Sequence, residues 1–164
     1  MLIRVPTSPR LAYRRLGPGD LDRFHALATD EHVRRYLMDG EVVPREWADD
    51  ELVASDRLFE TDRVGLWLVE EEGDVIGFAG FRVFPEVEPA PQLLYALLER
   101  VTGRGLATEI TAALIAHARE VGLAPILSAV DEVNAASVRV LEKAGFRRRG
   151  DRQGAFGVTR LYGL

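Results

Sequence analysis

The residues best suited to chemistry lie in a short glycine-containing turn past the middle of the chain. An apolar run at 93–98 is typical of a strand, and Arg100, Gly103 and Gly105 follow it before helical periodicity begins at Leu106. Free backbone N–H groups and the positive end of the helix dipole meet where such a helix starts. Glycine also lets a ligand approach the backbone closely. The turn predicts a phosphate-binding site, and a strand-to-helix turn that binds nothing is the alternative.

Two well-known nucleotide-binding motifs do not fit this turn. The pattern GxxxxGK[ST] is absent from the sequence, which excludes a Walker A loop. In the dinucleotide motif GxGxxG the third glycine would stand at Thr108. Only about 60 residues follow the turn, too few for the second nucleotide-binding half of a dinucleotide fold.

A second group of candidate residues lies in the segment NAASVRVLEKAGF, residues 134–146. Asn134 is the only asparagine of the chain, and Lys143 is its only lysine beside 20 arginines. A helix cap and a cation at the helix end would account for each residue separately. Their occurrence on one short helix favours a functional role for both residues.

The hydrophobic pattern predicts the elements that position these two segments. Apolar alternation and short apolar runs predict strands at 10–16, 64–69, 75–84, 93–98, 125–130, 146–153 and 158–162. Helical spacing and capping residues predict helices after Asp20 and Asp30, from Pro44, over 106–121 and after Asn134, which ends at Gly145 in a left-handed cap. The residues 85–91 are predicted to form a polar loop. Because hairpins coexist with a strand–helix–strand unit, we expect one α/β domain over residues 1–164 with a mixed sheet.

Composition narrows the class of protein. The 164 residues are 47% hydrophobic and 29% charged, as in an ordinary globular protein. The absence of cysteine excludes a disulfide framework and a cysteine nucleophile. The net charge of −5 argues against a nucleic-acid partner, and neither a signal peptide nor a membrane span is visible, so we expect a cytoplasmic protein. No metal site is predicted. An anionic ligand would need local positive charge, which Arg100 and Arg104 are placed to supply.

The two segments together resemble the GNAT superfamily of acyl-CoA-dependent N-acetyltransferases. The matching features are Arg100-x-x-Gly103-x-Gly105 followed by LATE, then Asn134-x-x-Ser137, then LEKAGF. Within the superfamily, the chain is similar to the branch that includes the RimJ/RimL ribosomal-protein N-terminal acetyltransferases. The resemblance covers nearly the whole chain. It implies the GNAT fold, a mixed central β-sheet flanked by helices, with splayed strands forming the acyl-CoA site.

The resemblance also implies roles for individual residues. Backbone N–H groups of the turn would hold the pyrophosphate of acetyl-CoA, and the strand before the turn would pair with the pantetheine arm. The N–H near Leu97 would stabilise the oxyanion, and Ser137 would protonate the departing thiolate. The cofactor-binding residues implied in this way are Leu97, Arg100, Val101, Thr102, Gly103, Arg104, Gly105, Leu106, Ala107, Thr108, Asn134, Ser137 and Lys143.

The chain departs from its relatives at two positions. Leu141 stands where many GNAT enzymes have a tyrosine proton donor, and Gln92 stands where relatives often have a glutamate base. Glu86, Glu88 or a water chain could replace that base. The expected reaction moves an acetyl group to a primary amine, on a protein N-terminus or on a small molecule. A non-catalytic acyl-CoA-binding or sensing module is the alternative, and a homodimer is one assembly that the sequence allows.

Overall fold

The chain folds around one seven-stranded sheet. The structure is a computed structural model that describes residues 4–154 and 156–164. The strands are β1 (Ala12–Arg15), β2 (Leu66–Glu71), β3 (Asp74–Phe84), β4 (Glu88–Leu97), β5 (Leu127–Asp131), β6 (Arg147–Gly154) and β7 (Gly157–Gly163). The α-helices are α1 (Leu21–Thr29), α2 (Glu31–Leu37), α3 (Arg45–Thr61), α4 (Leu106–Val121) and α5 (Ala135–Lys143). Two short 3-10 helices, Pro18–Asp20 and Glu99–Val101, precede α1 and α4. None of the described helices is long and apolar enough to cross a membrane.

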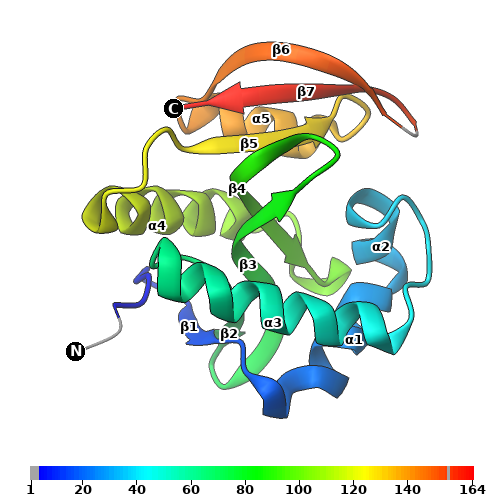
Figure 1. Cartoon of the computed structure of the whole chain (residues 1–164), viewed down its shortest axis with the longest axis vertical. Coiled ribbons are helices and arrows are strands. Elements are labelled where there is room, and N and C mark those ends of the chain that lie inside the picture. Colours follow the sequence, from blue (N-terminus) through cyan, green and yellow to red (C-terminus); the bar gives the residue numbers. More distant parts are fainter. Residues whose placement is uncertain (1–3, 155) are drawn as a thin grey trace.

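The sheet has the order β1-β2-β3-β4-β5-β7-β6 (Figure 1). Strands β1 to β4 form an antiparallel meander, and β5, β7 and β6 form a second antiparallel group. The two groups meet at β4 and β5, which run parallel because α4 connects them. The predicted mixed α/β sheet is therefore confirmed.

Strands β4 and β5 separate soon after they meet. Their ladder contains the single residue pair Gln92 and Leu127, and the Ser128 hydroxyl donates to the Leu93 carbonyl at 2.8 Å beside it. Beyond this point β4 keeps its pairing with β3 only, as far as Leu97. A gap therefore opens between the two halves of the sheet, as expected for splayed strands.

The helices cover both faces of the sheet. Alternate side chains of each strand belong to opposite cores, since successive side chains of a strand point to opposite faces. Trp67 and Val69 pack with the α4 and α5 side chains, whereas Leu66 and Leu68 pack with those of α1, α2 and α3. Both faces of β2 to β4, on one side of the gap, are thus buried.

Local capping chemistry confirms several predicted helix ends. The Asp30 carboxylate accepts from two backbone N–H groups of α2, and the Asn134 side chain accepts from the Ser137 N–H of α5. Gly145 has a φ of 99°, and the next residue, Phe146, donates its N–H to the Leu141 carbonyl, as in a Schellman cap.

Two predictions about local structure were wrong. Asp20 lies at the start of α1 but does not cap it, because its carboxylate binds the Arg14 guanidinium and the Gly17 N–H instead. The loop predicted at 85–91 is shorter than expected, because β4 already begins at Glu88. The hairpin predicted between the last two strands is present, and Ala155 in its turn lies outside the described residues.

Gly77 allows β3 to lie directly against the part of β4 that borders the gap. A Cβ added at Gly77 would lie 2.0 Å from the Ala96 carbonyl oxygen, far inside van der Waals contact. The β2–β3 register shifts between Val69 and Glu70, next to this glycine. A glycine inside a strand is typical of a bulge or of close packing, and both features are present beside Gly77.

Replacing Gly77 should therefore destabilise the sheet. We expect Gly77→Ala to lower the free energy of unfolding by about 2 kcal/mol or more, because the methyl group must displace the β4 backbone. Gly150→Ala is the matched control, since a Cβ there meets no described atom within 4 Å. Urea denaturation of both variants measures the difference. Equal stabilities of the two variants would show that β3 and β4 are not this close.

Candidate functional site

A cavity of about 870 Å³ occupies the gap between β4 and β5. Its walls come from β4, the turn after it, the start of α4, the end of β5 and α5, together with α2 and the β3–β4 connection. Segments far apart in the sequence meet here because the sheet halves separate at this point. The cavity is large enough for an extended small-molecule ligand.

The N-terminus of α4 opens into this cavity without a cap. Gly105 is its N-cap residue, with a φ of 79°, and has no side chain to accept a hydrogen bond. The first helical bond runs from the Glu109 N–H to the Gly105 carbonyl at 3.1 Å. Among the described residues, the N–H groups of Leu106, Ala107 and Thr108 have no partner. These three donors and the helix dipole suit a phosphate group.

The backbone of β4 also presents hydrogen-bonding groups to the gap. Leu98 donates its N–H to the Ile76 carbonyl of β3 at 3.0 Å. Because backbone groups alternate sides along a strand, the N–H groups of Leu97 and Tyr95 point away from β3, toward the gap. An extended ligand arm or a developing oxyanion can accept hydrogen bonds from these groups.

Two hydroxyl groups meet across the gap. The Tyr95 hydroxyl, from β4, lies 2.7 Å from the Ser137 hydroxyl, in the first turn of α5. Asn134 holds that turn in place by accepting from the Ser137 N–H at 3.3 Å. Burial raises the pKa of the Tyr95 phenol, and the hydrogen bond with Ser137 opposes this effect only in part. Tyr95 is therefore a neutral donor at neutral pH.

The structure brings most of the predicted site residues to one place. The predicted residues that line the cavity are Leu97, Val101, Thr102, Gly103, Gly105, Leu106, Ala107, Thr108, Asn134, Ser137 and Lys143. Arg100 and Arg104 are not part of its lining. Sequence reasoning missed Tyr95, although its position in the strand before the turn was a usable signal.

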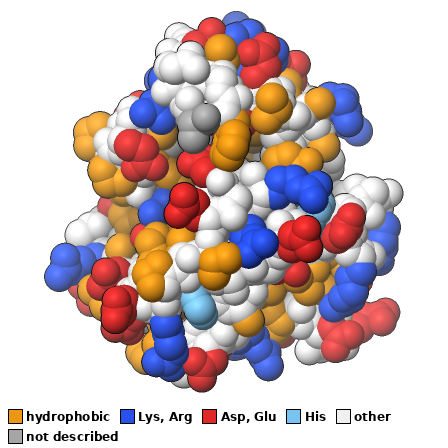
Figure 2. All heavy atoms as spheres, turned by 90° about the vertical axis from the view of Figure 1, so that its right-hand side faces the viewer, with side chains coloured by type: hydrophobic (Ala, Val, Ile, Leu, Met, Phe, Trp, Pro, Cys, Tyr) orange, Lys and Arg blue, Asp and Glu red, His pale blue; other side chains and the backbone are white. Residues whose placement is uncertain are grey.

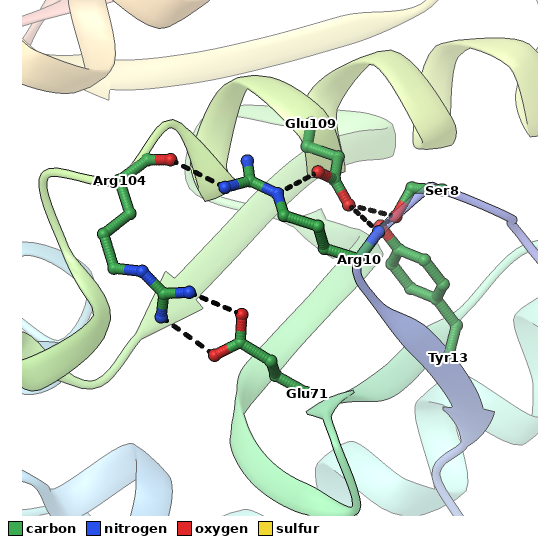
Figure 3. A network of polar contacts seen from close by, with 6 residues as sticks. All are labelled: Ser8, Arg10, Tyr13, Glu71, Arg104 and Glu109. Carbon is green, nitrogen blue, oxygen red and sulfur yellow. Dashed lines mark hydrogen bonds and ion pairs between the residues drawn. The ribbon is translucent and has the colours of Figure 1, made fainter.

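Arg104 is engaged away from the cavity. Its guanidinium binds the Glu71 carboxylate through two hydrogen bonds of 2.8 and 2.7 Å (Figure 3). The Arg104 guanidinium holds the pKa of the Glu71 carboxyl below its usual range. The positive charge that we expected Arg104 to offer to a ligand is thus already matched by a carboxylate.

A second arginine, from the start of the chain, supports the turn. Arg10 donates to the Arg104 carbonyl at 3.0 Å and to the Glu109 carboxylate at 2.7 Å, and its own N–H also reaches Glu109 (Figure 3). Ser8 donates to the same carboxylate and lies 3.0 Å from the Tyr13 hydroxyl. This network fastens the segment before β1 to α4 and fixes the turn from outside the cavity.

One part of the cavity wall carries three carboxylates. Asp39, Glu86 and Asp131 line the cavity, and none of these carboxylates forms an ion pair with a described residue. Burial raises the pKa of the Asp39 carboxyl, and the nearby Asp131, Glu41 and Glu86 raise it further. Figure 2 shows acidic, basic and hydrophobic side chains close together on this side of the molecule. Carboxylates without an ion-pair partner attract a cation.

Gln92 and Leu141, the two positions expected to depart from the GNAT pattern, differ in their relation to the cavity. Gln92 is buried where β4 meets β5 and does not line the cavity, and its side-chain oxygen has no partner among the described residues. Leu141 is buried and contributes an apolar wall. Of the two carboxylates considered as bases, Glu86 lines the cavity, whereas Glu88 pairs with Arg149.

Comparisons with known proteins place this architecture in a family. Residues 10–147 match the Acetyltransferase (GNAT) domain, so the chain belongs to the GNAT acetyltransferase family. A putative GNAT-family acetyltransferase from Bordetella pertussis has the same fold, with a TM-score of 0.81, 22% identity and 96% of each chain covered. The ribosomal L7/L12 alpha-N-protein acetyltransferase RimL, in complex with coenzyme A, gives a TM-score of 0.79 at 19% identity, covering 97% of this chain and 96% of that one.

Curated relatives carry the name mycothiol acetyltransferase. The protein from Parafrankia sp. (strain EAN1pec) is 29% identical over 120 residues, covering 62% of this chain and 37% of its own length. That from Thermobispora bispora is 34% identical over 92 residues, covering 53% and 31%. The chain therefore spans about a third of the length of these relatives.

The support of the turn by Arg10 can be tested through the pH dependence of stability. Burial alone would raise the pKa of the Glu109 carboxyl, but the hydrogen bonds from Arg10 and Ser8 outweigh it and lower that pKa below the usual 4.5. The stabilisation is thus present above pH 4.5 and is lost as the pH falls below it. Arg10→Gln should lower the free energy of unfolding by about 1 kcal/mol at pH 7 and by less at pH 4. The effect at pH 7 is modest because the Arg10 side chain is half exposed.

Urea unfolding at both pH values measures this cost. Arg57→Gln is the control, because Arg57 is exposed and forms no side-chain hydrogen bond with a described residue. A cost for Arg10→Gln that is the same at pH 7 and pH 4 would contradict the role of the Glu109 ion pair.

Proposed function

We propose that this chain transfers the acetyl group of acetyl-CoA to a primary amine by direct attack. The observation that carries the proposal is the uncapped N-terminus of α4 opening into the gap between β4 and β5. The three unpartnered N–H groups over residues 106–108 would hold the pyrophosphate, and the free edge of β4 would pair with the pantetheine arm. Membership of the GNAT family and the coenzyme A bound to RimL support this arrangement.

The catalytic roles follow from the direction of the bound thioester. With the pantetheine arm along β4, the carbonyl lies near the N–H of Leu97, which would stabilise the oxyanion formed by amine attack. The departing thiolate then lies toward α5, where Ser137 would protonate it. Holding acetyl-CoA and the amine together in one cavity would supply much of the rate enhancement.

The three carboxylates in the cavity wall favour one class of acceptor. Asp39, Glu86 and Asp131 have no cationic partner among the described residues, so they favour an amine with additional positive charge. The solved structures with this fold include an enzyme for a protein N-terminus and the aminoglycoside acetyltransferase AAC(6')-Ib in complex with ribostamycin. We propose a cationic amine acceptor, on a small molecule or at a protein N-terminus.

A panel of amines in single-turnover assays with acetyl-CoA tests the proposed function. The panel contrasts 1,4-diaminobutane with 4-aminobutanoate, and a dipeptide amide ending in lysine with one ending in glutamate. We expect acetylated product, formed faster from the cationic member of each pair. Binding of acetyl-CoA without transfer to any amine would favour the alternative, a non-catalytic acyl-CoA-binding module. No binding of acetyl-CoA would contradict both.

The role of Ser137 is tested with the best acceptor of this panel. Ser137→Ala should lower the rate of acetyl transfer by about 10²-fold, because the thiolate loses its proton donor, with little change in affinity for acetyl-CoA. A variant that transfers as fast as the wild-type protein would exclude Ser137 as the acid.

A further inference from the structure

The hydrogen bond between Tyr95 and Ser137 connects β4 with α5 inside the cavity. Closer to the point where the halves meet, they are joined by the pair Gln92 and Leu127 and by the Ser128 hydroxyl. Farther along β4, the Tyr95 hydroxyl reaches across to the Ser137 hydroxyl at 2.7 Å. Both side chains line the cavity. A ligand in the gap must therefore lie against this pair of hydroxyl groups.

The two hydroxyl groups carry two protons, and the hydrogen bond between them uses one of these protons. Each hydroxyl carries one proton and accepts through its lone pairs, and one proton is spent between the two oxygens. Neither hydroxyl has another partner among the described residues. One oxygen therefore has a proton to give to the cavity, and the other can accept a proton from it.

The proposed reaction needs a group with these two properties. When an amine attacks the thioester, its nitrogen must lose a proton and the departing sulfur must gain one. At the two positions where the resemblance implies a base and an acid, this chain has Gln92 and Leu141, which cannot transfer protons. An isolated serine hydroxyl is also a poor acid, because its alkoxide is too basic to persist at neutral pH.

We propose that Tyr95 and Ser137 form a two-hydroxyl relay that carries the proton of the attacking amine to the departing thiolate. As the N–C bond forms and the C–S bond breaks, the amine proton moves to the Tyr95 oxygen. The Tyr95 proton moves to the Ser137 oxygen, and the Ser137 proton moves to sulfur. Both hydroxyls end neutral, and the products are the amide and the thiol of coenzyme A. This inference rests on the proposed function.

The surroundings of the pair fit a relay better than a simple structural contact. Burial raises the pKa of the Tyr95 phenol, so Tyr95 remains protonated at neutral pH and can donate to Ser137. Asn134 caps α5 and fixes the turn that carries Ser137. Tyr95 itself lies on a strand packed against β3. Both oxygens are thus held by secondary structure, as proton transfer between them requires.

The test is a double-mutant cycle in single-turnover acetyl transfer. Tyr95→Phe and Ser137→Ala each break the relay, so each should lower the rate by at least about 10-fold with acetyl-CoA affinity unchanged. The double variant should be no slower than the slower single variant, because the two hydroxyls act as one unit. Rates in mixtures of H₂O and D₂O should curve for the wild-type protein, since several protons move together, and become linear in Tyr95→Phe.

Tyr162→Phe provides a matched control. Tyr162 is also buried, and its hydroxyl donates to the Glu142 carboxylate at 2.9 Å, but neither residue lines the cavity. Replacing Tyr162 with phenylalanine should leave the single-turnover rate unchanged.

The outcomes separate the relay from the proposed function. An active wild-type protein with Tyr95→Phe as fast as wild type, or with additive losses in the double variant, would overturn the relay alone. A linear response to D₂O in the active wild-type protein would do the same. A wild-type protein that binds acetyl-CoA and acetylates no amine would overturn the proposed function and the relay with it.

Discussion

The candidate site depends on the separation of β4 from β5, whose ladder contains a single residue pair. A sheet is held together by its ladder, and ending the ladder after the pair Gln92 and Leu127 leaves backbone donors and acceptors of β4 without strand partners. Helices packed on both faces of β2 to β4 keep these strands in place. The gap thus has a hydrogen-bonding edge, which an extended ligand can complete as an additional strand would.

Helices α4 and α5 both begin beside the gap but have different N-cap residues, Gly105 and Asn134. The two helix starts therefore differ in what they can bind. Asn134 satisfies an N–H group of α5 and so fixes the position of Ser137, whereas Gly105 leaves the first donors of α4 available. The glycine turn needs support from elsewhere, and Arg10 supplies it by binding the Arg104 carbonyl and the Glu109 carboxylate. In the proposed function, the start of α4 would bind the pyrophosphate and the start of α5 would serve proton transfer, both within one cavity.

The sequence predicted the parts of the structure that are determined by local chemistry. Caps such as Asp30 and Gly145, the glycine turn and the order of the elements follow from residues close together in the chain. The ion pairs of Arg10 with Glu109 and of Arg104 with Glu71 join distant segments, and no pattern along the chain indicates them. The early start of β4 was missed because Pro89 and Pro91 suggested a loop. Proline is tolerated there because β5 does not pair with that part of the strand.

In the proposed binding mode, the start of α4 and the free edge of β4 bind the two ends of one acetyl-CoA molecule. Backbone amide NMR shifts test it most directly, with acetyl-CoA compared against acetyl-pantetheine, which lacks the pyrophosphate and the nucleotide. We predict that acetyl-CoA shifts the amide signals of Leu97, Leu106, Ala107 and Thr108. Of these four signals, acetyl-pantetheine should shift only that of Leu97. Amides over residues 106–108 that respond equally to both ligands, or to neither, would contradict the account.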